Sequence, residues 1–463
     1  MLLARDGHQV TVVDRDGGPG PAGVERAWGG WKRQAVSQFH SPHLLLARGT
    51  QVLQTELPDV VDALDAHGAL RFNPVALGLA RIDPAGLRPE DERFTMVTGR
   101  RPMLEWVLGS CLAREPGVTV RRETAIEGLV ASPNGVGSVP HVVGLGLAGG
   151  EKLTADLVID ATGRRSPTPA WLQAIGARAP LEASEDSGFA YYSRFFRSGD
   201  GSVPPFLAPG LTPFGTISVL CIPADNGTWS VTIYALSRDA ALRGVRDVAA
   251  FERVIRACPA HAHWLEGEAI TDIEVMAGVT DRDYRFVVDG APVATGIATI
   301  GDAWACTNPS LGRGMSMGLM HAVLVRDVLR EVAGGIGGVG VDPRPLALEL
   351  DARTHGELGP WHQATRRLDR ARATEMGALV AGGEPVPDPV GNIACALQTA
   401  AFIDSAALRY QAELQGCLAL PSEVFGRPGA LDHVLAVAGS GAAPVFPGPV
   451  RAQLLELVSA APG

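Results

Sequence analysis

The sequence predicts an α/β protein. A Rossmann-like domain, built from two separate stretches of the chain, carries a β-rich insertion and is followed by a helical C-terminal region. Three observations lead to this prediction. Residues 1–15 have the pattern of a helix end and a strand that stops at an acid. The apolar run 298–300 predicts a buried strand, which leads into a glycine-rich turn and a helix. Between these features, strand-like patterns dominate residues 189–280.

The domain boundaries follow from these patterns. Residues 1–180 and 281–335 are expected to form the two parts of the Rossmann-like domain, and residues 181–280 a β-rich domain that forms one wall of a binding pocket. The Gly/Val/Pro-rich stretch 334–345 is expected to be a loop, and residues 346–463 the helical region. The hydrophobic periodicity predicts helices within 44–67 and at 101–112, 248–258 and 316–329, and paired strands at 118–130 and 141–147.

Composition and charge are those expected of a globular, cytoplasmic enzyme. Of the 463 residues, 46% are hydrophobic and 19% are charged, which fits two or three domains with sizeable cores. The net charge of −10 argues against a nucleic-acid partner, and no apolar run is long enough to span a membrane. The six cysteines are scattered without a Cys-x-x-Cys pair, which favours reduced thiols over disulfides or a metal site.

The N-terminal residues match the second half of a Rossmann β-α-β unit. A helix end stops at Gly7, and the strand from Val10 to Val13 leads to an acid, Asp14. In such units this acid binds the ribose hydroxyls of an adenosine, so Asp14 and its neighbour Arg15 are candidate cofactor-binding residues.

The first strand of this unit and its Gly-x-Gly-x-x-Gly loop would lie just before Met1. Either the true start is further upstream or the protein has lost its pyrophosphate cradle. The first explanation is favoured because Met1 falls within a helix pattern with no capping residue before it, and because a parallel sheet without its central strand leaves a buried slot. A literal match at 144–149 leads into a strand instead of a helix, so it predicts a hairpin turn.

The most informative stretch is 301–315, GDAWACTNPSLGRGM, which joins a predicted strand to a predicted helix. The Asp302 carboxylate can bind a sugar-like hydroxyl. Gly312 and Gly314 allow backbone N–H groups to approach a planar or anionic ligand, and the helix N-terminus favours negative charge at that point. The candidate cofactor-binding residues of this stretch are Asp302, Pro309, Gly312, Gly314 and Met315.

A second stretch lies upstream at 156–166, DLVIDATGRRS. It predicts a strand that leads into a tight turn. Gly163 would let the backbone pass close to a cofactor, which makes it a further candidate, and Asp160 would brace the turn.

Both stretches resemble the flavin-binding motifs of the FAD-dependent monooxygenases built like para-hydroxybenzoate hydroxylase. Residues 301–315 are similar to the second flavin motif of that family, and residues 156–166 look like its Ala-Thr-Gly turn merged with its Asp-Gly motif. The resemblance implies an FAD-binding Rossmann-like domain of the two-dinucleotide-binding type. It also implies that Asp302 lies near the ribityl chain and that the helix start faces the pyrimidine side of the isoalloxazine, where it stabilises negative charge on the reduced ring.

Further residues match the same family pattern. Arg33 and Gln38, in Arg-x-x-Val-x-Gln spacing, resemble a loop that folds along FAD in a bacterial subgroup, and Arg101 resembles an arginine near the ribityl and phosphate groups. His40 and His43 could line the pocket, although a structural role is the more frequent one for such histidines.

The resemblance also implies a reaction. NADH or NADPH binds transiently and reduces the flavin, and the reduced flavin forms a C4a-hydroperoxide with oxygen, which requires a dry, closed pocket. One oxygen atom then passes to a small hydrophobic or aromatic substrate. The sequence identifies no catalytic acid or base.

Other functions remain open from the sequence. A reductase that acts on an unsaturated, lipid-like substrate shares the same scaffold, and the chain could be a truncated, non-catalytic member of the fold. A flavin-dependent halogenase is less favoured, because the Trp-x-Trp-x-Ile-Pro element of that group is absent from the sequence. The presence of bound FAD would distinguish an enzyme from a non-catalytic member of the fold. Oxygen-dependent product formation would distinguish a monooxygenase from a reductase.

Overall fold

The computed structural model describes residues 1–17, 20–34, 36, 38–133, 139–332, 342–384, 388–442 and 444–460. Up to residue 180, the helices and strands are α1 (Leu2–Arg5), β1 (Val10–Val13), α2 (Val24–Gly30), β2 (Leu44–Leu45), α3 (Ala47–Glu56), α4 (Pro58–Ala66), β3 (Leu70–Phe72), α5 (Pro74–Ile82), β4 (Met96–Thr98), α6 (Arg101–Leu112), β5 (Val118–Arg121), β6 (Ile126–Ala131), β7 (Val142–Leu147), β8 (Lys152–Thr154), β9 (Val158–Asp160) and α7 (Thr168–Ala174).

The β-rich middle and the second Rossmann-like stretch contain β10 (Leu181–Asp186), β11 (Phe189–Arg197), β12 (Leu211–Phe214), β13 (Ile217–Pro223), β14 (Thr228–Leu236), α8 (Val248–Arg256), β15 (Glu268–Ala269), β16 (Glu274–Ala277), β17 (Thr280–Arg285), β18 (Val287–Val288), β19 (Ala291–Pro292), β20 (Ile297–Thr299), β21 (Ala305–Cys306) and α9 (Gly314–Glu331). The remaining elements are α10 (Arg344–Arg353), α11 (Gly359–Val380), α12 (Pro389–Ala400), α13 (Ser405–Gln415), α14 (Pro421–Phe425), α15 (Ala430–Ala438) and α16 (Arg451–Ser459).

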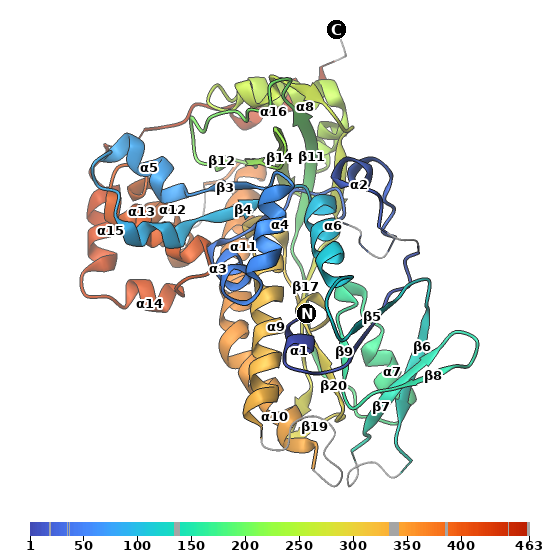
Figure 1. Ribbon diagram of the computed structural model, residues 1–463. Helices are drawn as coiled ribbons and strands as arrows, with labels where there is room; N and C mark the ends of the chain where they lie inside the picture. Colours follow the sequence, from blue (N-terminus) through green and yellow to red (C-terminus); the bar gives the residue numbers. More distant parts are fainter. Residues whose placement is uncertain are drawn as a thin grey trace.

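These bounds confirm the predicted helices and the helical C-terminal region. The predicted loop 334–345 lies mostly outside the described residues, and α10 already begins at Arg344. In Figure 1 the small sheets around β6–β8 lie on one side of the molecule and the helices α12–α15 on the other, with the long helices α9 and α11 between them. No helix in the described ranges is both long and apolar enough to cross a bilayer.

The Rossmann-like part contains two separate pairs of parallel strands. β1 pairs with β5, and β9 pairs with β20, and no strand of the described residues joins the two pairs. All three residues of β20 are half-buried, whereas the inner strands of a parallel sheet are normally covered completely. The prediction of a buried strand at 298–300 is therefore wrong about its burial, and the strand ends at Thr299.

The strand prediction for 118–130 also needs a correction. Val118–Arg121 forms β5 and joins the parallel pair, and only β6 pairs antiparallel with β7, so the stretch divides between two sheets. The break falls at Glu123, whose φ of +52° turns the chain. The Gly-x-Gly-x-x-Gly match at 144–149 lies at the end of β7 and leads into β8, which confirms the predicted hairpin.

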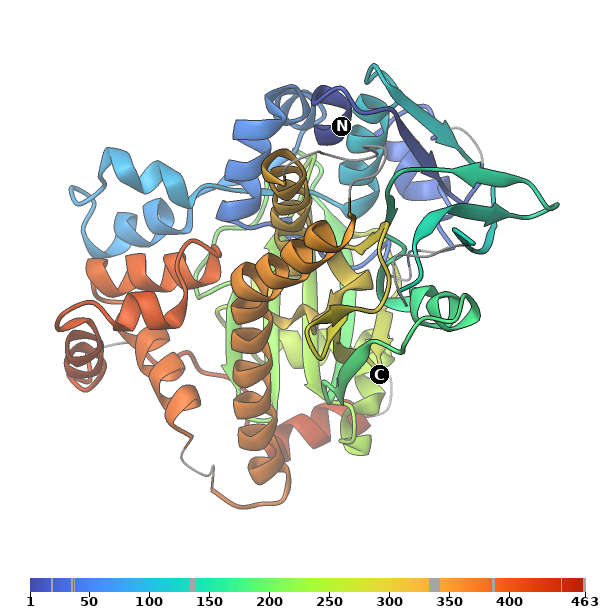
Figure 2. The same cartoon turned by 90° about the horizontal axis from the view of Figure 1, so that it is seen from below.

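The β-rich middle is a six-stranded sheet in the order β12-β13-β14-β11-β15, with β16 also paired to β11. Because side chains alternate along a strand, Tyr192 and Ile233 face a core made with α8 and α16, and Tyr191 and Tyr234 face the opposite way, toward Met376 of α11. Figure 2 shows α11 running along this second face.

Helix α9 fixes the position of the glycine-rich turn before it. It packs closely on α3, because Gly49 of α3 lies directly against Ser316: a Cβ at position 49 would lie 2.5 Å from Ser316 Oγ. Ser316 Oγ also accepts a hydrogen bond from the backbone N–H of Leu46, at 3.0 Å. The start of α9 is thus held against the first part of the domain.

Candidate functional site

Asp302 lies in a single turn between β20 and β21, as its place after a strand predicts. Its carboxylate makes no hydrogen bond to the described residues, although the surrounding protein desolvates it enough to raise its pKa. The charges that oppose this rise belong to Arg101, Arg164 and Arg282, which come from three different elements. A recessed carboxylate that is open to ligands and surrounded by cations suits a polar, anionic cofactor.

The three arginines are oriented by their own partners. Arg101 Nε donates to Glu105 Oε1 at 2.7 Å, and its NH1 lies 3.1 Å from His43 Nε2. His43 Nδ1 donates to the carbonyl of Ser41, and burial together with the Arg101 charge lowers the pKa of His43 to about 3, so His43 is a neutral acceptor. His43 therefore has the structural role that is more frequent for such residues.

Arg164 and Arg282 are functional candidates that the sequence reasoning missed. Arg282 NH2 donates to the carbonyl of Arg164 at 2.5 Å, and its guanidinium lies 5.0 Å from the ring centre of Tyr284. Arg164 directly follows Gly163, so the second motif contained a signal for it. Arg282 lies within β17 and belongs to no recognisable motif.

The turn after β9 is braced by Asp160. Its carboxylate accepts the backbone N–H of Thr162 at 2.8 Å and hydrogen bonds from the hydroxyls of Thr162, Ser166 and Thr168. The hydrogen-bonding capacity of the Asp160 carboxylate is therefore used within its own turn. Gly163 has a φ of +81°, and no atom lies within 4 Å of the position that a Cβ would take. That open space beside a left-handed glycine would allow a cofactor to approach the backbone.

In the turn before α9, backbone atoms are more accessible to a ligand than side chains are. Gly312 has a φ of +64°, and Gly314 is exposed at the first position of the helix. Pro309 begins a single 3₁₀ turn that ends at Leu311. The Met315 side chain packs against the core formed by α3, α4 and α6, so only its backbone is available to a ligand.

The predicted residues near the adenosine end come together in one charged network. Arg33 donates to Asp14 at 3.1 Å, to Asp16 at 2.9 Å and to Glu105 at 3.1 Å. Since Glu105 also binds Arg101, one acid links the two predicted arginines. Asp14, which directly follows β1, is therefore held in place by Arg33.

Arg15 and Gln38 lie apart from this network. Arg15 is exposed. Gln38 Nε2 lies 3.3 Å from the sulfur of Met276 on β16, so the loop that contains it reaches the β-rich sheet. Ala35 and Ser37 of the same loop are outside the described residues.

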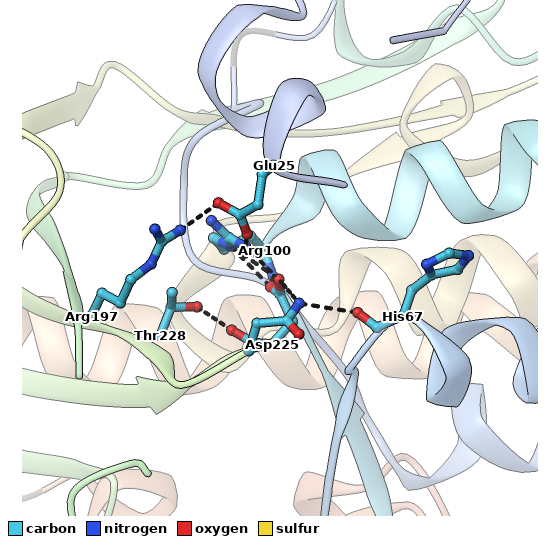
Figure 3. A network of polar contacts seen from close by, with 7 residues as sticks. Glu25, His67, Arg100, Arg197, Asp225 and Thr228 are labelled. Atoms are coloured by element: carbon cyan, nitrogen blue, oxygen red, sulfur yellow. Dashed lines mark hydrogen bonds and ion pairs between the residues drawn. The ribbon is translucent and has the colours of Figure 1, made fainter. Parts of the chain in front are cut away.

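Arg100, the neighbour of Arg101, has a structural role instead. Figure 3 shows it between Asp225 and Glu25. Arg100 and Asp225 are fully buried and paired at 2.6 Å, and Glu25 binds both Arg100 and Arg197. The Arg100 guanidinium also lies 5.0 Å from the ring centre of Trp28. This ion-pair network joins α2, the start of α6 and the β13–β14 turn.

Comparison with known proteins adds distant relatives. No protein-family model matches the chain. It is 27% identical over 361 residues to protein Rv3254 of Mycobacterium tuberculosis, a match that covers 74% of this chain and 72% of that protein. It is 28% identical over 196 residues to a D-amino acid dehydrogenase of Xanthobacter autotrophicus, covering 42% of this chain and 38% of the dehydrogenase.

Solved structures match over most of the chain. PqsL, a probable FAD-dependent monooxygenase from Pseudomonas aeruginosa, has a TM-score of 0.55 at 17% identity and covers 82% of this chain and 94% of its own. The oxygenase of 2-methyl-3-hydroxypyridine-5-carboxylic acid has a TM-score of 0.53 at 15% identity, covering 81% and 88%. The flavin-dependent brominase Bmp2 has a TM-score of 0.57 at 14% identity, covering 93% and 98%. The chain therefore has the α/β fold of FAD-dependent oxidoreductases, with a β-rich middle and a helical C-terminal region.

Proposed function

We propose that the protein is an FAD-dependent monooxygenase that uses NADH or NADPH and oxygen to insert one oxygen atom into a small hydrophobic or aromatic substrate. The observation that carries this proposal is the Asp302 carboxylate at the start of the glycine-rich turn. It has no hydrogen-bond partner among the described residues, and the charges of Arg101, Arg164 and Arg282 act on it. Such a site provides an acceptor for sugar-chain hydroxyls beside a concentration of positive charge, which is what a ribityl diphosphate requires.

Residues of this chain would hold the ribityl chain, the phosphates and the flavin ring of FAD. Asp302 would accept the ribityl hydroxyls, Arg101 and Arg164 would neutralise the phosphates, and Gly163 would let the backbone approach. The N-terminus of α9 at Gly314 would face the flavin ring and favour negative charge there. Bound FAD would supply the redox chemistry and the activation of oxygen, while the protein binds, orients and excludes water.

The substrate would lie against the face of the β-rich sheet that looks toward this turn. Ser193 and Thr232 sit opposite each other on that face with their hydroxyl oxygens 2.8 Å apart, and Tyr191 donates to Asn308 beside the turn at 2.7 Å. Trp28 packs edge-on against Phe195 of the same sheet, with 5.0 Å between ring centres. Aromatic walls with few hydroxyls suit a small apolar or aromatic molecule and help keep water out.

Flavin binding tests the proposal first. The full-length protein is titrated with FAD and binding is followed by flavin fluorescence. Asp302→Ala is expected to raise the Kd about 10- to 100-fold, since it removes a charged hydrogen-bond acceptor worth about 1.5–3 kcal/mol. The matched control is Asp289→Ala in the exposed turn of the β18–β19 hairpin, which is expected to leave the Kd unchanged. Equal affinities for all three proteins would refute the assigned site.

Oxygen transfer distinguishes the monooxygenase from its alternative. The D-amino acid dehydrogenase relative favours a second candidate, an oxidoreductase that moves electrons without inserting oxygen. Turnover of candidate substrates under isotopically labelled dioxygen is expected to place one labelled atom in the product. Product formation under argon, with no label incorporated under dioxygen, would favour a reductase or dehydrogenase instead. The Bmp2 match concerns the fold, and the sequence lacks the Trp-x-Trp-x-Ile-Pro element of halogenases.

A further inference from the structure

A buried polar cluster holds the flavin-facing turn from behind. We call it the turn-anchoring cluster: Tyr191, Asp281, Asn308, Ser310 and Asp369, all buried. The backbone N–H of Asn308 donates to Asp281 Oδ1 at 2.6 Å, and its side-chain oxygen accepts from Tyr191. Ser310 Oγ donates to Asp369 Oδ1 at 2.6 Å. The two residues that flank Pro309 are thus fixed to β17, β11 and α11.

Asp369 has an unusual environment for a carboxylate. It is 6% exposed, and its Oδ2 has no hydrogen-bond partner among the described residues. Arg313 is close enough to lower the pKa of Asp369, but its NH1 donates to Thr365 at 2.9 Å and its NH2 to the carbonyl of Leu414 at 3.0 Å. A buried carboxylate with one oxygen that lacks a partner is costly to ionise.

The groups around Asp369 leave it as the side chain that changes charge near neutral pH. Burial raises its pKa to about 7, against the opposing effects of the Ser310 hydroxyl, the Asn308 side-chain amide and the Arg313 charge. Arg313, at the start of α9, remains a cation near neutrality. Burial raises the pKa of Tyr191 on β11 and of Tyr234 on β14, which therefore stay neutral. Asp281 on β17 adds a second buried carboxyl whose charge favours a proton on Asp369.

We propose that Asp369 is a positioning residue for the flavin: through Ser310 it holds the Pro309–Leu311 turn in place, and its proton makes the reduced, negatively charged flavin easier to form. This inference rests on the flavin site proposed above. Two-electron reduction adds negative charge at the α9 N-terminus, and an ionised Asp369 behind the turn would oppose that charge in a poorly screened interior. At a pH above the pKa of Asp369, where this carboxyl is ionised, reduction would then draw a proton from solvent onto it.

The test is the reduction potential of the FAD-loaded, full-length protein, measured against redox dyes from pH 5.5 to 8.5. The wild-type potential is expected to fall more steeply with pH around 7 than that of Asp369→Asn, which is neutral at every pH and similar in shape. Neutralising one charge is expected to change the ratio of reduced- to oxidised-flavin affinity about tenfold at pH 8.5, or about 30 mV for a two-electron couple. Asp289→Asn, on an exposed hairpin, is the control and should follow the wild type.

A second variant and a flavin-free measurement keep the test decisive. Ser310→Ala removes a hydrogen bond that lowers the pKa of Asp369, so the steep region should move to higher pH. In the protein without FAD, the infrared band of a protonated carboxyl should titrate near pH 7 and be lost in Asp369→Asn. Parallel potentials in wild type, Asp369→Asn and Ser310→Ala would overturn the inference while leaving the flavin site intact. Failure to bind FAD would instead refute the proposed function, and with it this inference.

Discussion

Two buried or recessed charges, Asp302 and Arg100, show how this chain separates function from structure at the level of single residues. Asp302 has cations around it but no hydrogen-bond partner among the described residues, so it can bind a ligand. Arg100 is fully buried between Asp225 and Glu25, so a ligand has no access to it. The sequence offers two adjacent arginines, and only the packing shows that Arg101 faces the site.

Breaking the Arg100 pair should be costly. Asp225→Asn leaves a buried guanidinium with less compensation, and removal of one partner of a buried pair costs about 3–5 kcal/mol. We expect a loss of that size in the free energy of unfolding, measured by urea denaturation. The control is Asp65→Asn, which breaks the exposed pair with Arg71 and should cost less than about 1 kcal/mol. Similar losses in both variants would contradict the structural role of Arg100.

His321 should make stability depend on pH. It is 2% exposed, its Nδ1 accepts the backbone N–H of Gly301 at 3.2 Å, and burial lowers its pKa to about 4. Below pH 6.5 the unfolded chain takes up a proton here that the folded chain does not, so stability falls as the pH drops from 6.5 to 4. His321→Asn keeps an acceptor for Gly301 and removes the titration. Its free energy of unfolding should fall less over this range, by up to about 3 kcal/mol. Parallel pH profiles would show that His321 does not titrate as described.

At the scale of elements, the close approach of α3 and α9 holds the Pro309–Leu311 turn that precedes α9. Gly49→Ala gains up to about 1 kcal/mol of helix propensity, but its Cβ would lie 2.5 Å from Ser316 Oγ. Overpacking costs about 1–3 kcal/mol, so we expect net destabilisation in thermal or urea unfolding. Gly109→Ala is the matched control: it lies on α6 with no atom within 4 Å and should stabilise by about 0.5–1 kcal/mol. Partial rescue of Gly49→Ala by Ser316→Gly would confirm the contact, and stabilisation by Gly49→Ala alone would disprove it.

Sequence patterns predict the elements better than their partners. The helices at α6, α8 and α9 follow from hydrophobic period, which is a local property. The division of 118–130 between two sheets does not, because strand pairing depends on residues far away in the chain. Motifs are also local, so they predicted Asp302 and Gly163. Arg282, in contrast, approaches the site only through the pairing of β17 with β21. Asp369 lies on a C-terminal helix without any motif, and only tertiary packing brings it to Ser310.

At the scale of the whole molecule, the sheet and the proposed cofactor site are linked. The pairs β1–β5 and β9–β20 are followed by Asp14 and by the turn that contains Gly163, so two separate stretches of the sequence contribute to the proposed site. The helical C-terminal region contributes as well, because α11 carries Asp369, which binds Ser310 in the turn before α9.

The most direct test of the central claim is the flavin absorbance of the purified protein. It is measured after incubation with excess FAD and removal of the free cofactor. We predict one FAD per chain in the wild type and much less in Asp302→Ala. If the wild-type protein retains no FAD, the protein is not a flavoenzyme and the site around Asp302 has another use.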